Sequence, residues 1–254
     1  MTSANPNPPL IAGIDGCPAG WIAVIHPLNQ PEHATWHIFE TFAALLKHTT
    51  TFAAIAVDMP IGLPETATPG GREADRMARA VLGDRQSSVF AVPARATVNC
   101  HDYHLACETN LAHSDPPRKV AKQTFYLFPK IREIDALITP ALQQRLVECH
   151  PEVAFWAING KQPLIEPKKR KSAPYPPGLD LRRALLAGAG YHTELLSGPE
   201  CPRRLAASDD LLDACATAWT ANRLASGPSS TGTTERFPPV PQLDSRGLRM
   251  EIVY

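Results

Sequence analysis

Residues 10–15 read Leu-Ile-Ala-Gly-Ile-Asp, an apolar run closed by an acid, and a second such run at residues 52–57 is closed by Asp58. Short unbroken apolar runs are typical of buried strands. An unpaired carboxylate in an apolar setting is costly, so an acid after such a strand is either solvated at the strand tip or holds a cation. The two acids therefore mark a candidate site where the two strands end.

A third acidic group lies far along the chain, in a helix expected over residues 209–224. Residues three apart on a helix project to the same side, so Asp210 and Asp213 face the sheet edge together, and three alanines beyond them let the helix approach closely. Four clustered carboxylates repel one another, and two Mg²⁺ ions about 4 Å apart are the usual solution in phosphodiester hydrolysis. We therefore expect Asp15, Asp58, Asp210 and Asp213 to bind Mg²⁺ or Mn²⁺.

Each of these acids also has a structural interpretation that needs no metal. Asp210 lies where acids stabilise a helix N-terminus, although Asp213 lies at or beyond the limit of the first turn. Asp15 suits a turn acid that caps the following loop, and Asp58 suits an acceptor of backbone N–H groups before Pro60. These alternatives explain single residues better than they explain the set.

The elements expected from pattern alone alternate between strands and helices. Residues 10–14 and 21–26 predict a hairpin about a turn at 16–20, and residues 35–40 predict a third strand. Thr41 is an expected N-cap for a helix that ends near Lys47. The run at 52–57 predicts a central parallel strand, reached by a right-handed crossover.

Beyond Asp58 the pattern predicts a long, mostly helical insertion over about residues 61–144. Helices are expected within it at 72–82 and 101–113. A fifth strand is expected at 145–149, followed by a helix from Pro151 to about 160. An exposed loop at 161–177, which contains Lys168-Lys169-Arg170-Lys171, and a helix at 179–186 precede the last helix. The expected organisation is a disordered tail at 1–9, one domain at 10–225, a Gly-, Ser-, Thr- and Pro-rich linker at 226–241, and a C-terminal segment at 242–254.

The composition suits one α/β domain with a substantial core, since 44% of the 254 residues are hydrophobic. Lys plus Arg and Asp plus Glu both number 25, which weighs against a tight nonspecific binder of polyanions. No apolar stretch is long enough to span a bilayer. The six cysteines form no CxxC pair and the N-terminus lacks a signal-peptide pattern, so we expect a reduced cytoplasmic protein without membrane contact.

Three further residues surround the end of the fifth expected strand. Glu148, His150 or Glu152 would complete a metal sphere or transfer a proton, with His150 titrating nearest neutrality. The alternative places Glu152 in the first turn of a helix and pairs His150 with a backbone carbonyl.

Basic residues of the insertion predict a phosphate-facing wall beside the acids. The candidate substrate-binding residues are Arg72, Arg76, Arg95 and Lys130. Acids interleave with them, so a solvated face is the competing interpretation.

Two other groups of residues suggest ligand sites of a different kind. Cys100, His101, His104 and Cys107 are zinc-ligand types, but four residues at that spacing on one helix do not converge. The glycines at 13, 16 and 20 are similar to the phosphate hairpin of actin-like ATPases, although the segment at 17–19 is Cys-Pro-Ala where that loop is richer in Gly, Ser and Thr.

The order of strands, insertion and helices resembles the RNase H-like fold, and several motifs together resemble the predicted RNase H-fold nucleases catalogued as domain of unknown function 429. The motifs are Gly13-Ile14-Asp15-Gly16, Asp58-Met59-Pro60-Ile61-Gly62-Leu63-Pro64, Arg85-Gln86-Ser87-Ser88-Val89-Phe90, Pro129-Lys130-Ile131-Arg132-Glu133-Ile134-Asp135, Glu148-Cys149-His150-Pro151-Glu152 and Asp209-Asp210-Leu211-Leu212-Asp213-Ala214. The last of these also resembles RuvC-type Holliday-junction resolvases. That resemblance implies that the helix acids join strand-end acids to bind magnesium.

The expected protein is thus an α/β, RNase H-like mixed five-stranded sheet flanked by helices, with a helical insertion after the fourth strand. We expect a metal-dependent nuclease or related phosphodiester hydrolase that uses two metal ions and has nucleic acid as its partner. The alternatives are a non-catalytic binding or scaffold protein on the same fold and an actin-like nucleotide-binding phosphotransferase. The choice among DNA, RNA and a small phosphoester stays open, as does the oligomeric state, with a homodimer as one option.

Overall fold

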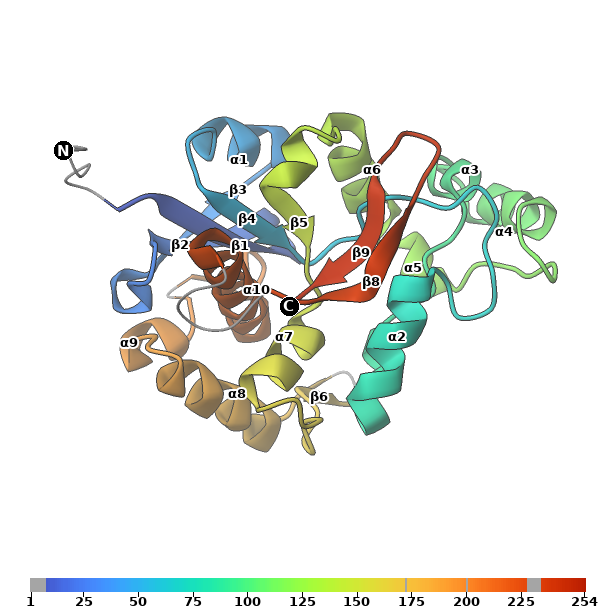
Figure 1. The fold of residues 1–254 in the computed structure, drawn as a ribbon. Coiled ribbons are helices and arrows are strands. Elements are labelled where there is room, and N and C mark those ends of the chain that lie inside the picture. The colour runs from blue at the N-terminus through green and yellow to red at the C-terminus, as the bar shows by residue number, and fades with distance from the viewer. Residues whose placement is uncertain (1–7, 172, 200, 228–233) are drawn as a thin grey trace.

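A mixed five-stranded sheet forms the centre of the molecule in the computed structural model, which describes residues 8–171, 173–199, 201–227 and 234–254 (Figure 1). The strand order is β3-β2-β1-β4-β5. The strands are β1 Leu10–Cys17, β2 Gly20–Pro27, β3 Thr35–Phe39, β4 Ala54–Val57 and β5 Leu146–Glu148. The β1–β2 and β2–β3 pairs are antiparallel, whereas β1, β4 and β5 run parallel. This sheet confirms the predicted fold class.

Side-chain alternation along β1 and β4 sends the two strand-end acids to one face of the sheet. Ile11 in β1 and Ala54 and Ala56 in β4 pack on the face covered by helix α10, Ser208–Ser226. Alternate residues of a strand share a face, so Asp15 and Asp58 continue these two rows. The parallel register pairs Ile14 with Val57, one residue before each acid. The two carboxylates are therefore neighbours at the C-terminal edge of the strands.

Helix α10 lies unusually close to β1, because Gly13 has no side chain. A Cβ on Gly13 would lie 1.9 Å from the backbone nitrogen of Ala218 and 2.3 Å from the backbone oxygen of Ala214. Both alanines are fully buried. Small residues on both sides thus let the helix backbone rest directly on the strand; the alanines had this predicted role, whereas that of Gly13 was not predicted.

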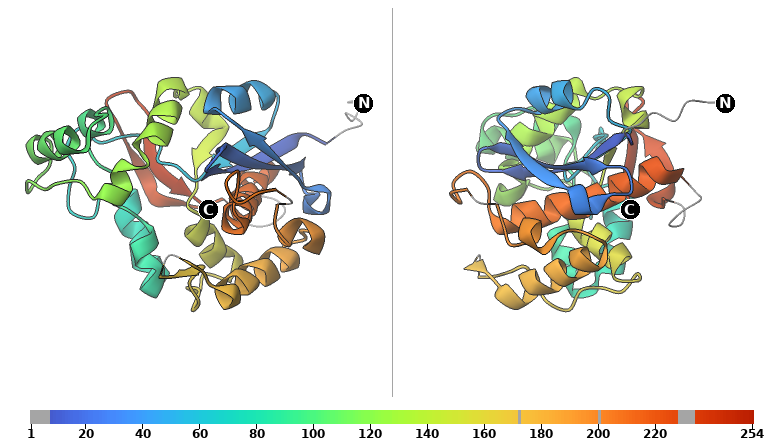
Figure 2. Two further views of the ribbon diagram at one scale, coloured as in Figure 1. Left: turned by 180° about the vertical axis from the view of Figure 1, so that it is seen from behind. Right: turned by 90° about the vertical axis from the view of Figure 1, so that its left-hand side faces the viewer.

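The opposite face of the sheet packs against α1, Phe42–His48, and α6, Phe128–Leu137, as two further views show (Figure 2). Ile14 and Val57 join a core with Phe42 and Leu45 from α1 and Phe128 from α6. Thr41 caps α1 by accepting a hydrogen bond from the Ala44 amide, as predicted. The sheet is therefore covered on both faces.

The segment between β4 and β5 is helical, which confirms the predicted insertion. Its helices are α2 Glu73–Leu82, η2 Gly83–Ser88, α3 Arg95–Val98, α4 Tyr103–Ala112, α5 Lys122–Phe125, α6 Phe128–Leu137 and η3 Leu142–Gln144. The remaining helices are η1 Pro31–His33, α1 Phe42–His48, α7 Pro151–Ile158, α8 Pro176–Gly188 and α9 Thr193–Leu196. Among the residues that the structure describes, none of the helices is long and apolar enough to cross a membrane.

The predicted linker is wrong from residue 236 onward. Strand β8, Arg236–Leu243, pairs antiparallel with β9, Arg249–Val253, and Phe237 packs against Trp156 of α7. The prolines of β8 suggested a linker, but an edge strand tolerates residues that lack an N–H group. Residues 228–233 of that linker and residues 1–7 of the predicted tail lie outside the described residues.

The loop predicted at 161–177 contains a small hairpin, in which β6, Lys169–Arg170, pairs with β7, Ala173–Pro174. The expectation that its basic run is simply exposed is wrong for Lys168, whose side chain is 27% exposed and contacts α10.

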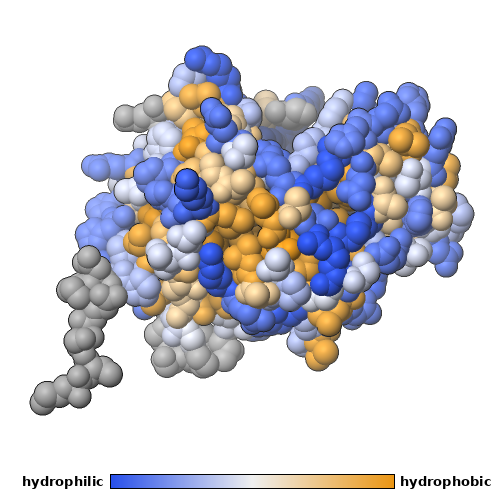
Figure 3. Space-filling model, turned by 90° about the horizontal axis from the view of Figure 1, so that it is seen from above, coloured by the Kyte–Doolittle hydropathy of each residue, from blue (hydrophilic) through white to orange (hydrophobic). Residues whose placement is uncertain are grey.

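On the face of the molecule seen from above, apolar residues lie near the middle with hydrophilic residues around them (Figure 3).

Candidate metal centre

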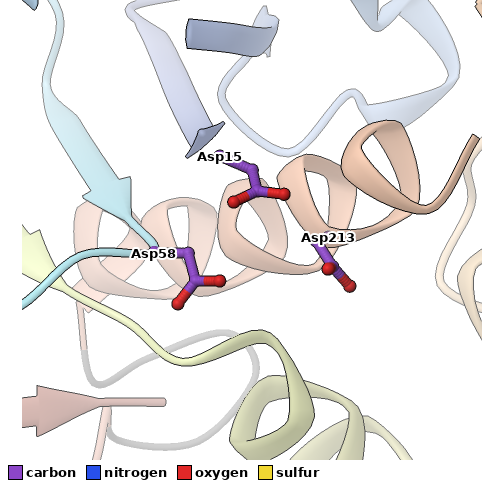
Figure 4. Close-up of side chains that lie close together, drawn as sticks. All are labelled: Asp15, Asp58 and Asp213. Atoms are coloured by element: carbon purple, nitrogen blue, oxygen red, sulfur yellow. The ribbon is translucent and has the colours of Figure 1, made fainter. Parts of the chain in front are cut away.

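Three carboxylates from three different elements meet at the C-terminal edge of the central strands. Asp15 belongs to β1, Asp58 directly follows β4, and Asp213 lies in the second turn of α10 (Figure 4). Each contributes one oxygen, and these three oxygens all lie within 4.8 Å of one another. In the described part of the chain, no other group of three or more His, Cys, Asp and Glu side chains is placed in this way.

The charged form of this cluster is unfavourable, because burial disfavours the ionised state of each carboxyl. Burial, and then the charges of Asp58 and Asp213, raise the pKa of Asp15 well above its ordinary value. Burial raises the pKa of Asp58 to about 7 and that of Asp213 to about 6, although the Lys168 ammonium lowers both. Such acids gain more from a bound cation than exposed acids do.

Around the cluster, the hydrogen-bond donors of the described residues leave a buried carboxylate oxygen without a partner. The Gly16 amide donates to Asp15 Oδ1 at 2.7 Å, and Lys168 Nζ donates to Asp213 Oδ2. Asp213 is 2% exposed, and its Oδ1 is buried with no hydrogen-bond partner among the described residues. A buried acceptor without a donor is costly in a folded protein. Three convergent carboxylates with an open acceptor are a donor set that fits a hard divalent cation.

Asp210, the fourth predicted ligand, is not in this group of three. Its Oδ2 accepts a hydrogen bond from the Ala207 amide at 2.8 Å, which closes the N-terminus of α10. The structural interpretation therefore holds for Asp210, because a carboxylate at the third helical position reaches back to the N-cap amide. The neighbouring Asp209 pairs with Lys169 at 2.6 Å.

The comparison with protein families supports one identification. The model of a family described as "Protein of unknown function (DUF429)" matches residues 13–243. The chain belongs to the DUF429 family. The matched residues include all three acids of the cluster and Lys168. No curated protein and no solved structure matches the chain.

In this DUF429 protein, the two glutamates predicted near the site are each paired with a buried arginine. Glu148 Oε1 lies 2.5 Å from Arg72 Nη2, and Glu148 also accepts from the Ile61 amide. Glu152 accepts two hydrogen bonds from Arg182 Nη2, at 2.6 and 2.7 Å. Their carboxylates are thus neutralised within the fold and are not part of the metal-ligand group.

Both ring nitrogens of His150 are engaged by backbone groups. His150 is the N-cap of α7, where its Nδ1 accepts from the Glu152 amide at 3.2 Å. Its Nε2 lies 3.3 Å from the Ser88 carbonyl oxygen, which it reaches as a donor. Burial lowers the pKa of His150, which favours the neutral ring. This arrangement matches the structural alternative for His150 and leaves neither nitrogen free to move a proton.

The basic residues expected to face phosphate are held by internal partners. Arg76 Nη1 donates to the Gly71 carbonyl at 2.6 Å. Arg95 bridges Asp135 and Asp244. Lys130 Nζ donates to the Gly20 carbonyl and lies 4.5 Å from the centroid of the Trp21 ring. Together with the Arg72 ion pairs, these contacts give the four predicted residues structural roles here.

The two other predicted ligand sites gain no support. Cys100, which precedes α4, and Cys107 within it are buried in the core, apart from the metal-ligand group. The β1–β2 turn does not present its amides outward, because Gly16 donates to Asp15 and the Ala19 amide donates to the Leu205 carbonyl. This turn therefore differs from an open phosphate-binding hairpin.

Sequence reasoning missed two residues that shape the site. Lys168 reaches Asp213 only because the hairpin folds over the N-terminal end of α10, and Arg182 reaches Glu152 from the middle of α8. Lys168 was hidden in a basic run, and Arg182 lies in an ordinary amphipathic helix. Neither position carries a local signal that would have indicated its partner.

Proposed function

We propose that this DUF429 protein is a metal-dependent phosphodiester hydrolase, and specifically a nuclease, whose Asp15, Asp58 and Asp213 hold Mg²⁺ or Mn²⁺. The observation that carries the proposal is the convergence of three carboxylate oxygens within 4.8 Å, together with the unpartnered Asp213 Oδ1. Oxygen ligands of this kind suit both cations.

A cation held there would lower the pKa of a bound water and offset the charge that develops on a phosphodiester in the transition state. The protein's own residues prepare the site for this chemistry. The Gly16 amide orients Asp15, and the close packing of α10 on β1 positions Asp213. The pKa of Asp58 is raised to about 7, so its carboxyl would release a proton near neutrality if it took up a cation.

The three-carboxylate group supports one cation more directly than two. A second ion would need a further ligand, and Asp210 would be available only after leaving the Ala207 amide. The two-ion form of the proposal therefore requires a rearrangement at the start of α10.

The cavity next to Asp58 has a volume of about 20 Å³, which is room for about one water molecule and not for a base or sugar. Apolar and charged side chains line it together, among them Phe90 and the Arg72–Glu148 ion pair. The balanced charge of the chain favours local contacts with nucleic acid over a broad basic groove.

The test combines metal binding with hydrolysis. Mn²⁺ should raise the melting temperature of the wild type but not that of Asp58→Asn, and the exposed Asp84→Asn should behave as the wild type. With Mg²⁺ or Mn²⁺, the wild type should cleave at least one member of a panel of single-stranded DNA, duplex DNA, RNA, a four-way junction and bis-(p-nitrophenyl) phosphate.

The outcomes separate the candidate functions. Asp58→Asn should lose cleavage while Asp84→Asn retains it. A wild type that ignores Mn²⁺ would exclude the metal centre and leave the scaffold alternative. Stabilisation by Mn²⁺ without cleavage of any substrate in the panel would retain the metal site and reject the nuclease.

A further inference from the structure

The most specific feature around the cluster is a pair of lysines from the β6–β7 hairpin. Lys168 Nζ donates to Asp213 Oδ2, and Lys169 Nζ lies 2.6 Å from Asp209 Oδ2. Asp209 and Asp213 are one turn apart on α10 and are 5% and 2% exposed. The hairpin is therefore attached to this helix through two adjacent ion pairs beside the carboxylate cluster.

Backbone contacts place Lys168, so its position does not depend on the ion pair alone. The Tyr175 amide donates to the Lys168 carbonyl at 2.9 Å, and Arg182 Nη1 donates to the Glu166 carbonyl at 3.1 Å. Gly178 in α8 lies so close that a Cβ there would be 1.9 Å from the Pro167 carbonyl oxygen. The chain just before β6 is thus held against the first turns of α8, and this packing directs Lys168 toward the cluster.

The Lys168 ammonium interacts with the whole cluster and not only with Asp213. Its charge lowers the pKa of Asp15, Asp58 and Asp213 alike, against the effect of their burial. Burial lowers the pKa of Lys168 itself, but the negative charges of Asp213, Glu152 and Asp15 together raise it by more than burial lowers it. The ammonium therefore stays charged. One protein cation therefore offsets part of the negative charge that a metal ion would otherwise offset.

We infer that Lys168 is a built-in counter-ion of the carboxylate cluster, which a divalent cation must displace from Asp213 in order to bind. The inference rests on the proposed metal centre. An ammonium and a divalent cation repel each other at short range, and they compete for the same carboxylate. The lysine stabilises the metal-free cluster and, for the same reason, weakens metal binding.

The experiment measures Mn²⁺ affinity by isothermal titration calorimetry at pH 8, where protons compete little for the carboxylates. Lys168→Met should bind Mn²⁺ about tenfold more tightly than the wild type, which corresponds to about 1.4 kcal/mol. Lys168→Arg keeps the charge and should bind as the wild type does, within about threefold. The exposed Lys171→Met controls for the loss of one positive charge and should also remain within that range.

A second measurement uses the wild type alone, so that it does not depend on a variant that folds. Lysine acetylation by an N-hydroxysuccinimide ester, followed by mass spectrometry, should modify Lys168 several times faster with saturating Mn²⁺ than without it. Lys171 should react at the same rate in both conditions.

The outcomes separate the two proposals. Equal or weaker Mn²⁺ binding by Lys168→Met, or acetylation of Lys168 that ignores bound Mn²⁺, would overturn the counter-ion role and leave the metal centre intact. Absence of Mn²⁺ binding in the wild type and in all three variants would overturn both.

Discussion

Gly13 of β1 and Ala218 of α10 lie so close that a methyl group on Gly13 would be 1.9 Å from the Ala218 nitrogen. This contact sets the distance between the strand and the helix, and therefore between Asp15 and Asp213, which belong to the same two elements. The proposed metal centre therefore depends on a glycine that itself offers no ligand. If the three carboxylates bind a cation, its affinity is coupled to the close packing of these two backbones.

Gly13→Ala should force α10 away from β1. Overpacking of this kind typically costs about 1–3 kcal/mol and sometimes more, and it should also weaken Mn²⁺ binding because Asp213 moves with the helix. Gly188→Ala is the matched control, since a Cβ there meets no atom within 4 Å. Urea unfolding and Mn²⁺ titration measure both effects. A Gly13→Ala protein with unchanged stability and metal affinity would contradict the coupling.

Asp213→Asn and Asp210→Asn should behave differently, although the residues lie three apart on one helix. Asp213→Asn removes a ligand and should abolish stabilisation by Mn²⁺. Asp210→Asn keeps an oxygen that can accept from the Ala207 amide and should retain most of that stabilisation. Thermal-shift titrations of the two variants check this difference. Equal loss in both would place Asp210 among the ligands.

Glu152→Ala should act on stability and not on metal binding. It leaves the fully buried Arg182 guanidinium without its bidentate partner, which typically costs about 3–5 kcal/mol. Urea unfolding should show this loss, while Mn²⁺ affinity of the folded variant should change less than threefold, about 0.7 kcal/mol. The opposite pattern, a stable variant that no longer binds Mn²⁺, would assign Glu152 to the metal centre.

The stability of the metal-free protein should fall as the pH rises from about 4 to about 7. The pKa of Asp58 is raised to about 7 and that of Asp213 to about 6, so the folded state binds these protons more tightly than the unfolded state does. The stabilising contribution of the protonated carboxyls is therefore lost over this range. Melting temperatures at successive pH values should decline less steeply in Asp58→Asn than in the wild type.

Saturating Mn²⁺ should reverse this trend. The cation binds the deprotonated carboxylates, so its stabilising effect should grow as the pH rises through 6 and 7 and should vanish below the pKa of Asp213, which is about 6. An Mn²⁺ effect that is equal at pH 5 and pH 8 would be inconsistent with binding at these carboxyls.

Much of the fold follows from local pattern. The apolar runs that became β1 and β4 are unbroken because both faces of these central strands are covered. Thr41 and the alanines of α10 likewise had the roles that their sequence context predicts. Strand β8 was missed because its prolines are typical of a linker, and only the pairing with β9 explains why an edge strand accepts them.

Only part of the candidate site was predictable from the sequence, and there is a physical reason why the rest was not. Asp15 and Asp58 were found because each closes an unbroken apolar run, and parallel strands bring their C-terminal ends to one edge. Asp210 was assigned to the site from its spacing to Asp213 on a helix, and Glu148 from its place at a strand end, yet both carboxylates meet other partners. A side chain's nearest donor is a property of the packed structure, which composition and spacing do not encode.

The order of residues alone specified the sheet, its two strand-end acids and a helix bearing acids beside them, because strand and helix periodicity are properties of short segments. Tertiary packing decided which helix acid faces the strands, and it brought Lys168 from a basic surface run onto Asp213. These contacts join residues 45 positions apart or more, so they exist only once Gly13, Gly178 and their neighbours have brought the backbones together.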